Sequence, residues 1–323
     1  MYTSLRLRIQ PLLRRYNIFG RFGIKKAVVY RCDGTSFHGG LCDRFKGIVV
    51  SYAFAKATKR PFKILYNFPF QLTDFLEPRQ TDWVPKNGDV CTSIFGVALR
   101  RIVGCKTLEP LKEIEDSWRQ IHLYAGSNEE ILVAINIEWG QTYSFGKLFA
   151  ELFKPSVELQ ERLQDVQKEI GGEYIGIHLR FQSLLGDFDE YEYSSTKRKS
   201  VRASYPTLEE KEQNKLIEKC VSKTGDIKAS ERSKKILVLS DSQKFLKVAE
   251  RCEDVMVYPS RSIHIDARRP DATHEDYLKV FQDFFALAKA TKIYSLVTNE
   301  MYTSDFPRVA SMVNDVPFER VSF

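Results

Sequence analysis

The chain has 323 residues, 43% of them hydrophobic and 12% aromatic, and this composition excludes general disorder. It carries 49 Lys and Arg against 42 Asp and Glu, a formal charge of +7. Seven of the bases and no acid lie in residues 1–26, so the remaining residues carry 42 of each. A duplex-binding protein needs a basic stripe across its folded body, which this balance argues against. A membrane-surface or partner-binding arm stays open.

Other totals also exclude classes of protein. No uninterrupted apolar stretch approaches the length of about 18 residues that a transmembrane helix needs, and the N-terminus lacks the apolar core of a signal peptide. The six cysteines are scattered without a CxxC pair, and the five histidines have no metal-ligand spacing. We therefore expect reduced thiols, no zinc site and a cytoplasmic location.

Residues 1–26 are predicted to be a basic N-terminal arm that precedes the first domain. Apolar residues at helical spacing predict a short helix that starts near Pro11. This helix either packs on the body with its arginines in water or lies on a membrane surface.

Strands and helices alternate through the next part of the chain, except in residues 68–130, where no clear element is predicted. The predicted strands are 26–32, 61–67 and 131–139. The predicted helices are 43–58, 145–153 and 157–170, the last capped by Ser156. The run Ile131–Trp139 is assigned to a strand because its apolar residues are nearly continuous.

The second half alternates more regularly. The predicted strands are 173–181, 235–239, 255–258 and 292–296. The predicted helices are one capped by Thr207 with Glu210 in a capping box, and then 242–251, 273–290 and 304–313. This alternation predicts an α/β protein with parallel sheets. We expect two Rossmann-like domains facing across a cleft, at 27–155 and 156–323.

Ligands of such sheets bind beyond the carboxyl ends of the strands, where several polar groups fall. His178 and Arg180 close the strand 173–181, and their spacing points both to one face. The guanidinium of Arg180 suits a phosphate, because it offers paired and permanently charged donors. The alternative is an arginine paired with a surface acid.

Two further groups follow later strands. Asp241 could accept hydrogen bonds from a guanine-like edge or a ribose, or it could cap the next helix. Thr303, Ser304 and Phe306 open the last helix, whose free amides and hydroxyls form either an anion site or an ordinary cap.

The first strand is followed by a glycine turn. Gly39 and Gly40 let the backbone approach a ligand closely before a helix begins, with His38 ahead of them and Asp43 in the first helical turn. The sequence matches neither GxGxxG nor the P-loop pattern. The alternative is a simple strand–helix turn.

Together these groups resemble the motifs of the fucosyltransferase superfamily. Gly176–Arg180 with Gly186–Phe188 resembles its HxR…GD signature, and His38–Gly47 resembles its N-terminal glycine-loop motif. Ser240–Ser242 is similar to its (S/T)D(D/S) element, and Ser304–Ala310 resembles the start of its C-terminal helix. The four motifs occur in the family's order and span most of the chain.

The resemblance implies a GT-B fold and an inverting transfer of fucose from GDP-fucose to a glycan hydroxyl, with no required metal or other cofactor. It implies that Arg180 holds the β-phosphate and that His178 and Asp241 contact the guanine or its ribose. The residues implied for the diphosphate pocket are Thr303, Ser304 and Phe306. Those implied for the sugar side, in the acceptor-side domain, are His38, Gly39, Gly40 and Asp43.

One departure concerns the segment after Arg180. In many relatives Gly-Asp follows the arginine almost at once, whereas residues 181–185 intervene here, nearer to the protein O-fucosyltransferases. This puts the place of Asp187 near the acceptor in doubt.

A carboxylate is expected to take the acceptor proton. The candidates are Asp43, Asp187, Asp189 and Glu190, and each could instead be a solvated loop charge or a helix cap. Residues 187–206 change from acidic to basic and carry tyrosines, so they form either an acceptor-binding loop or a solvated insertion. The Asp187-Phe188-Asp189 match to DxD also leaves a metal-dependent transferase open.

We therefore expect a bacterial-type cytoplasmic fucosyltransferase of surface polysaccharide synthesis, with a GDP-sugar donor, a glycan acceptor and no nucleic-acid partner. The alternatives are a transferase that uses another GDP-sugar, such as GDP-mannose, and a non-catalytic GDP-sugar or glycan-binding protein. Residues 1–26 are expected to touch anionic membrane peripherally, since each base near such a surface contributes about 1 kcal/mol.

Overall fold

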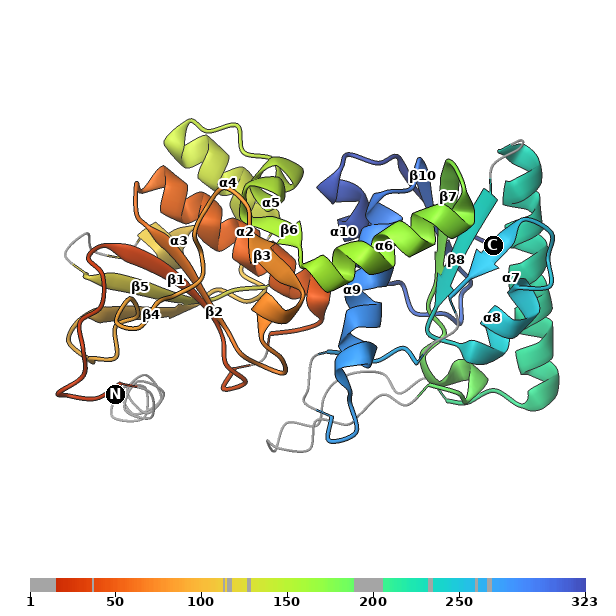
Figure 1. The fold of residues 1–323 in the computed structure, drawn as a ribbon, viewed down its shortest axis with the longest axis horizontal. Coiled ribbons are helices and arrows are strands. Elements are labelled where there is room, and N and C mark those ends of the chain that lie inside the picture. Colours follow the sequence, from red (N-terminus) through yellow and green to blue (C-terminus); the bar gives the residue numbers. More distant parts are fainter. Residues whose placement is uncertain are drawn as a thin grey trace. The chain divides into compact units, whose positions relative to one another are not determined.

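The structure is a computed structural model of the whole chain (Figure 1). It describes residues 16–36, 38–112, 114, 118–126, 129–188, 206–231, 235–258, 261–265 and 269–323. The chain divides into two units, Met1–Lys154 and Pro155–Phe323. The helix predicted near Pro11 lies outside the described residues. Among the helices described, none combines the length and apolar character that crossing a membrane requires.

The first unit contains a sheet of four parallel strands in the order β2-β1-β5-β4. Its strands are β1 (Ala27–Cys32), β2 (Phe62–Tyr66), β4 (Val97–Arg101) and β5 (Gln120–Tyr124). Its helices are α2 (Leu41–Ala57), α3 (Glu109–Lys112), α4 (Glu129–Trp139) and α5 (Phe145–Leu152), with a 3-10 turn η1 (Leu72–Asp74). The short strands β3 (Leu76–Pro78) and β6 (Phe153–Pro155) pair with each other. Strand β1 is almost wholly buried, as the apolar run that predicted it requires.

Helix α2 lies at the centre of this unit and contacts β1, α4 and α5. Its residues from Leu41 to Ala55 are buried with the exception of Asp43. Gly47 makes the close packing possible, because a Cβ at that position would lie 2.2 Å from the carbonyl oxygen of Ala125, just after β5. The glycine turn and the end of β5 are thereby brought together.

The strand predicted at Ile131–Trp139 is wrong, because these residues belong to helix α4. Ile131 and Ile135 are fully buried, whereas Val133 is 60% and Ile137 is 80% exposed. A strand would place all four side chains on one face, but a helix separates them in this way. The run stays helical because only one side of it packs on α2, and β5, which was not predicted, joins the sheet instead.

The second unit contains five parallel strands in the order β11-β10-β7-β8-β9. The strands are β7 (Tyr174–Leu179), β8 (Lys235–Ser240), β9 (Val255–Val257), β10 (Lys292–Val297) and β11 (Phe318–Ser322). The helices are α6 (Val157–Ile170), α7 (Glu210–Ser230), α8 (Gln243–Ala249), α9 (His274–Ala288) and α10 (Phe306–Val313), with a 3-10 turn η2 (Gln182–Leu185). Four of the strands confirm the sequence prediction, and β11 was missed.

Helix caps explain where the helices of this unit begin. Ser156 accepts a hydrogen bond from the Leu159 amide and caps α6, as predicted. The cap predicted at Thr207 is wrong, since α7 begins at Glu210 and its N-cap is Glu209, which forms a capping box with Glu212. The glutamate pair satisfies the amides of Glu209 and Glu212, two residues later than the predicted pair.

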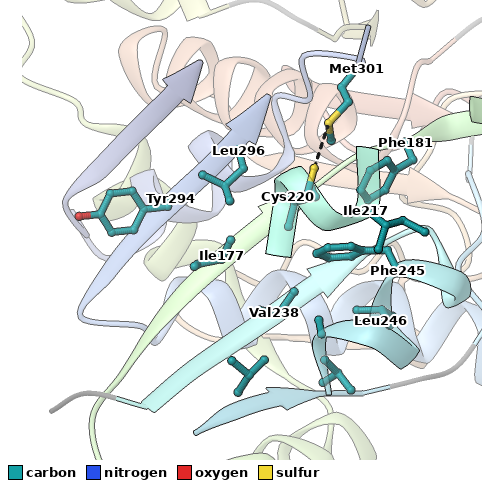
Figure 2. Close-up of a cluster of buried hydrophobic side chains, with 14 of the residues drawn as sticks. Ile177, Phe181, Ile217, Cys220, Val238, Phe245, Leu246, Tyr294, Leu296 and Met301 are labelled. Carbon is teal, nitrogen blue, oxygen red and sulfur yellow. Dashed lines mark hydrogen bonds between the residues drawn. The ribbon is translucent and has the colours of Figure 1, made fainter. Parts of the chain in front are cut away.

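The two faces of strand β7 have different roles. Ile177 points into the apolar core that Figure 2 shows, where it lies with Val238 of β8, Leu296 of β10 and residues of α7 and α8. The adjacent Gly176 faces α9, and a Cβ there would lie 2.6 Å from a methyl group of Leu287. Because side chains alternate along a strand, His178 shares the α9 side with Gly176. One face of β7 thus packs in the apolar core, and the other face carries the polar side chain of His178.

Candidate functional site

His178 lies at the carboxyl end of β7, between Ser295 of β10 and Leu239 of β8. It is 8% exposed, and its ring stacks on that of Phe306, with the ring centres 5.5 Å apart. Nδ1 has no hydrogen-bond partner among the described residues. Burial, together with the charges of Arg180 and Lys279, lowers the pKa of His178 to about 3. The imidazole is therefore neutral at physiological pH and offers one donor and one acceptor.

The start of α10 forms the wall beside this histidine. Phe306 is the first residue of the helix, two residues later than predicted, and Phe284 of α9 meets its ring edge-on at 5.6 Å. Ser304 is 7% exposed, and its hydroxyl accepts a hydrogen bond from the Phe306 amide at 3.2 Å, whereas Thr303 is exposed. The N-cap of α10 is Asp305, so neither Thr303 nor Ser304 is the helix cap, and the Ser304 hydroxyl instead fixes the turn that precedes the helix.

Lys279 of α9 belongs to the same neighbourhood, and sequence reasoning missed it. It is 5% exposed and forms an ion pair with Asp283 one turn later on the helix. Burial raises the pKa of Asp283, against the pull of Lys279. No motif marks this lysine, because its position beside His178 arises from the packing of α9 on the sheet.

Arg180 leaves the strand on the same side as His178. Its Nε lies 3.6 Å from Oδ2 of Asp241, and its guanidinium lies 5.0 Å from the ring centre of Phe188. The side chain keeps 15% exposure. A carboxylate and an aromatic face therefore hold a permanent positive charge at the carboxyl edge of the sheet.

Asp241 follows β8 and is 6% exposed. Its two carboxylate oxygens accept hydrogen bonds from the amides of Phe181 and Gln182, both at 2.8 Å. Gln182 has φ +54, a left-handed conformation that a side chain other than glycine rarely adopts, and the carboxylate fixes the chain there. Ser242, not Asp241, is the N-cap of α8. Asp241 thus positions the turn that carries Arg180.

Asp187 lies against the start of α8. Its Oδ2 accepts hydrogen bonds from the Ser242 hydroxyl at 2.9 Å and from the Lys244 amide at 2.7 Å. Of the alternatives open for this carboxylate, the helix cap is the one realised, and the helix N-terminus favours a negative charge there. Asp189, Glu190 and the rest of the predicted acceptor loop up to residue 205 lie outside the described residues.

The glycine turn of the first unit is held by an arginine. Gly39 has φ +73, and a Cβ on it would lie 2.2 Å from Oδ2 of Asp43. Arg44 is fully buried and donates hydrogen bonds to the carbonyl of Gly39 at 3.0 Å and to the hydroxyl of Tyr66 at 2.7 Å. The motif residue Arg44, which received no role from the sequence, therefore fixes the shape of the turn. Phe37 lies outside the described residues.

The remaining predicted residues of this turn differ in their access to solvent. His38 is 1% exposed, with its ring 5.5 Å from that of Tyr124, and Gly40 is the N-cap of α2. The Asp43 side chain keeps 35% exposure and lies 3.5 Å from Nζ of Lys46. Asp43 is thus a carboxylate that a ligand can reach, with its charge partly balanced by a lysine.

Sequence reasoning missed a polar network at the carboxyl ends of β1 and β5. One oxygen of Asp33 accepts hydrogen bonds from Arg31 at 3.0 Å and from the Tyr124 hydroxyl at 2.8 Å. Arg31 also lies 3.2 Å from Nδ1 of His122. The signal for Arg31 and Asp33 was present, since they close a strand with the same spacing as His178 and Arg180.

The described residues include no group of three or more His, Cys, Asp or Glu side chains arranged to hold a metal ion. The residues that the motifs select lie at the carboxyl edges of the two sheets, one group in each unit.

No protein-family model and no curated protein sequence matches the chain. Solved structures do match. Fucosyltransferase NodZ from Bradyrhizobium has a TM-score of 0.52 and 14% identity, over 88% of this chain and 92% of that chain. NodZ alpha-1,6-fucosyltransferase soaked with GDP-fucose has a TM-score of 0.50 and 17% identity, over 90% of this chain and 92% of that chain. A mutant of Arabidopsis thaliana FUT1 in complex with GDP has a TM-score of 0.58 and 13% identity, over 99% of this chain and 76% of that chain.

At these identities the similarity concerns the fold. It covers both units of the chain, and it agrees with their two parallel sheets. The predicted α/β class is confirmed, while the cleft between the domains stays a prediction. The chain therefore has the GT-B fold, with two Rossmann-like units, that these fucosyltransferases share.

Proposed function

We propose that this protein is an inverting fucosyltransferase that transfers fucose from GDP-fucose to a hydroxyl of a glycan acceptor. The observation that carries the proposal is a group of four residues at the carboxyl edge of the second sheet, in which His178 and Asp241 are buried and Arg180 and Phe306 are partly buried. It occurs in a fold shared with fucosyltransferases that were solved with GDP or GDP-fucose. Open α/β sheets bind their ligands at this edge.

In the proposed reaction the sugar–phosphate bond breaks and leaves negative charge on GDP. Arg180 stabilises that charge on the β-phosphate, because Asp241 and Phe188 hold its guanidinium in place before the substrate arrives. In the proposal the amides and hydroxyls near Thr303 and Ser304 contact the same diphosphate.

His178 and Phe306 supply the surface for the nucleoside. A neutral imidazole can form hydrogen bonds with the polar edges of guanine or ribose. Because it carries no charge, it does not attract anions in general. Asp241 acts there through the Arg180 turn, since its oxygens are already bonded to backbone amides.

A carboxylate of the first unit takes the proton of the acceptor hydroxyl in this proposal. The exposure of Asp43 and its place beside Gly39 and Gly40 favour it as the base. The cap that Asp187 forms on α8 favours a structural role for that residue. His38 then shapes the sugar side of the turn through its packing on Tyr124.

The setting of the reaction is also part of the proposal. We place it in the cytoplasm, in bacterial surface polysaccharide synthesis, with no required metal and with peripheral contact between residues 1–26 and anionic membrane. The support for that contact is the concentration of seven bases without an acid in those residues.

The test is release of GDP from GDP-fucose by wild-type protein and by Arg180→Ala. We expect the variant to lose about two to three orders of magnitude in rate, the usual effect of removing one preorganised charge-stabilising donor. Arg162→Ala is the matched control, because that arginine lies in the same unit, is 43% exposed and forms its ion pair with the exposed Glu275.

Three outcomes would contradict the proposal in different ways. Full activity of the Arg180→Ala variant would show that Arg180 does not stabilise the leaving diphosphate. Faster turnover of GDP-mannose than of GDP-fucose would favour another donor sugar. GDP binding without any turnover would favour the non-catalytic alternative.

A further inference from the structure

The first unit carries two neighbouring turns with exposed phenylalanines at their tips. In the turn at 17–20 the Gly20 amide donates to the Asn17 carbonyl at 3.1 Å, and Phe19 is 93% exposed. In the turn at 93–96 the Gly96 amide donates to the Ser93 carbonyl at 3.4 Å, and Phe95 is 66% exposed. Ile18 and Phe22 flank the first turn at 55% and 49% exposure.

The two turns together form an aromatic ridge, which consists of the side chains of Ile18, Phe19, Phe22 and Phe95. These are four of the eight large hydrophobic residues found exposed in the described part of the chain. Exposed apolar residues gathered in one place indicate an interaction surface, whereas scattered ones are ordinary.

Backbone hydrogen bonds join the two turns. The Asn17 amide donates to the Thr92 carbonyl at 2.8 Å, and the Ile94 amide donates to the Asn17 carbonyl at 3.2 Å. Beneath them Tyr16 is 5% exposed, packs with Cys91 and Val97, and hydrogen-bonds His122 through its hydroxyl at 2.6 Å. The exposed rings are therefore held outward by a fixed backbone.

Most of the charge around the ridge is positive. Residues 16–26 and 91–96 contain Arg21, Lys25 and Lys26 and no acid. Arg119 lies 5.7 Å from the ring centre of Phe22. The nearby Asp89 carboxylate is 3.5 Å from Nζ of Lys63, which offsets its charge. The four arginines among residues 1–15 add to the positive charge in the sequence directly before the ridge.

We infer that the aromatic ridge docks this protein on an anionic lipid bilayer, with the rings among the lipid headgroups and the surrounding bases on their phosphates. Apolar side chains combined with Lys and Arg are the pattern of interfacial membrane binding, which needs both kinds of contact. Three residues of the ridge, Ile18, Phe19 and Phe22, belong to the basic arm, so the arm carries apolar side chains beside its bases. The inference extends the membrane contact of the proposed function and is independent of the donor.

The test is co-sedimentation of the full chain with vesicles of phosphatidylglycerol and phosphatidylcholine, compared with phosphatidylcholine alone. We expect binding to the anionic vesicles only, with a bound fraction that falls as salt rises. In Phe19→Ser/Phe95→Ser the ratio of bound to free protein should fall about ten-fold, because two rings are lost from the apolar contact.

The matched control is Val133→Ser/Ile137→Ser, which removes two residues of 60% and 80% exposure from α4 of the same unit. It should bind as the wild type does, and melting temperatures verify that every variant is folded. Arg21→Glu/Lys25→Glu should lose binding to anionic vesicles and much of its salt dependence. Failure of wild-type binding, or full binding by the phenylalanine variant, would overturn the inference while leaving GDP-fucose turnover untouched.

A second readout separates lipid from protein partners. A Phe19→Trp variant should show quenching by brominated lipid in anionic vesicles beyond that of the wild type, whose own tryptophans give the background. Self-association of the wild type that the phenylalanine variant abolishes, without any quenching, would instead make the ridge an interface between two copies of the chain.

Discussion

At the scale of single residues, Asp241 shows how one carboxylate shapes the predicted donor site. It accepts hydrogen bonds from the amides of Phe181 and Gln182 and lies beside Arg180. Asp241→Asn replaces one acceptor by an NH2 group and leaves a buried amide without a partner, which costs about 1–3 kcal/mol. The free energy of unfolding in urea should fall by that amount, and affinity for GDP should fall about ten-fold as Arg180 loses its position.

The control for this variant is Asp226→Asn, in the same unit. The Asp226 carboxylate is 65% exposed and lies 3.7 Å from Lys223, so its loss should change stability by less than about 0.5 kcal/mol. Equal stability of Asp241→Asn and the wild type would show that the carboxylate does not hold the turn.

His122 makes the stability of the first unit depend on pH. Its Nδ1 receives hydrogen bonds from Tyr16 at 2.6 Å and from Arg31 at 3.2 Å. Because arginine can only donate, Nδ1 is the acceptor and Nε2 carries the hydrogen, which it donates to Gln120 at 2.9 Å. Burial, together with the charge of Arg31, lowers the pKa of His122 well below its usual value.

The unfolded chain therefore takes up a proton at this histidine below about pH 6.5, and the folded chain does not. Its contribution to stability is complete above that pH and decreases as the pH falls, by up to about 1.4 kcal/mol per pH unit. We expect His122→Gln to show a smaller loss of stability between pH 6.5 and about 4.5. Tryptophan fluorescence follows this unit alone, because all three tryptophans, Trp83, Trp118 and Trp139, lie in it. Identical pH slopes would contradict the lowered pKa.

At the scale of elements, helix α4 gives a test that separates helix from strand. Ile135→Ala removes a fully buried side chain and should cost about 2–4 kcal/mol of unfolding free energy. Ile137→Ala removes one that is 80% exposed and should cost less than about 0.5 kcal/mol. A strand would bury both residues on one face and make the two losses similar, so equal effects in urea unfolding would contradict the helix.

The elements that could be predicted from the sequence are those in which the pattern of apolar and polar residues matches the pattern of burial. Buried strands such as β1 and β7 read as apolar runs, and helices such as α6 read as amphipathic. Strand β5 was missed because Gln120 and His122 are buried within it, where a network of side chains satisfies them. Strand β11 has mostly exposed residues and gives little apolar signal.

Part of the candidate site could also be predicted from the sequence, because some of its residues follow predicted strands. The rule that ligands meet the carboxyl ends of strands selected His178, Arg180 and Asp241. It did not reveal that Asp241 would bond to amides 59 and 60 residues earlier in the chain, or that Asp187 would cap α8. Lys279 reaches the site only through the packing of α9. These contacts depend on tertiary structure and leave no local pattern.

At the scale of the whole molecule, the positive charge of the chain is concentrated away from the residues proposed to act in the reaction. The net charge of +7 lies on residues 1–26, and the rest of the chain is balanced. In the proposed reaction the donor diphosphate needs one arginine and local amides, and in the proposed membrane contact the arm and the aromatic ridge hold the protein at an anionic surface. Removal of residues 1–15, which precede the buried Tyr16, should therefore leave donor affinity unchanged.

The central claim is that the second unit binds a guanosine diphosphate through the edge that carries His178 and Arg180. Calorimetric titration with GDP, UDP and ADP, on the wild type and on Arg180→Ala, tests it most directly. We expect the wild type to bind GDP and neither of the other nucleotides. Arg180→Ala should weaken GDP binding about ten-fold to a hundred-fold, as expected for loss of a charge-assisted contact. Absence of GDP binding, or equal binding of UDP, would contradict the claim.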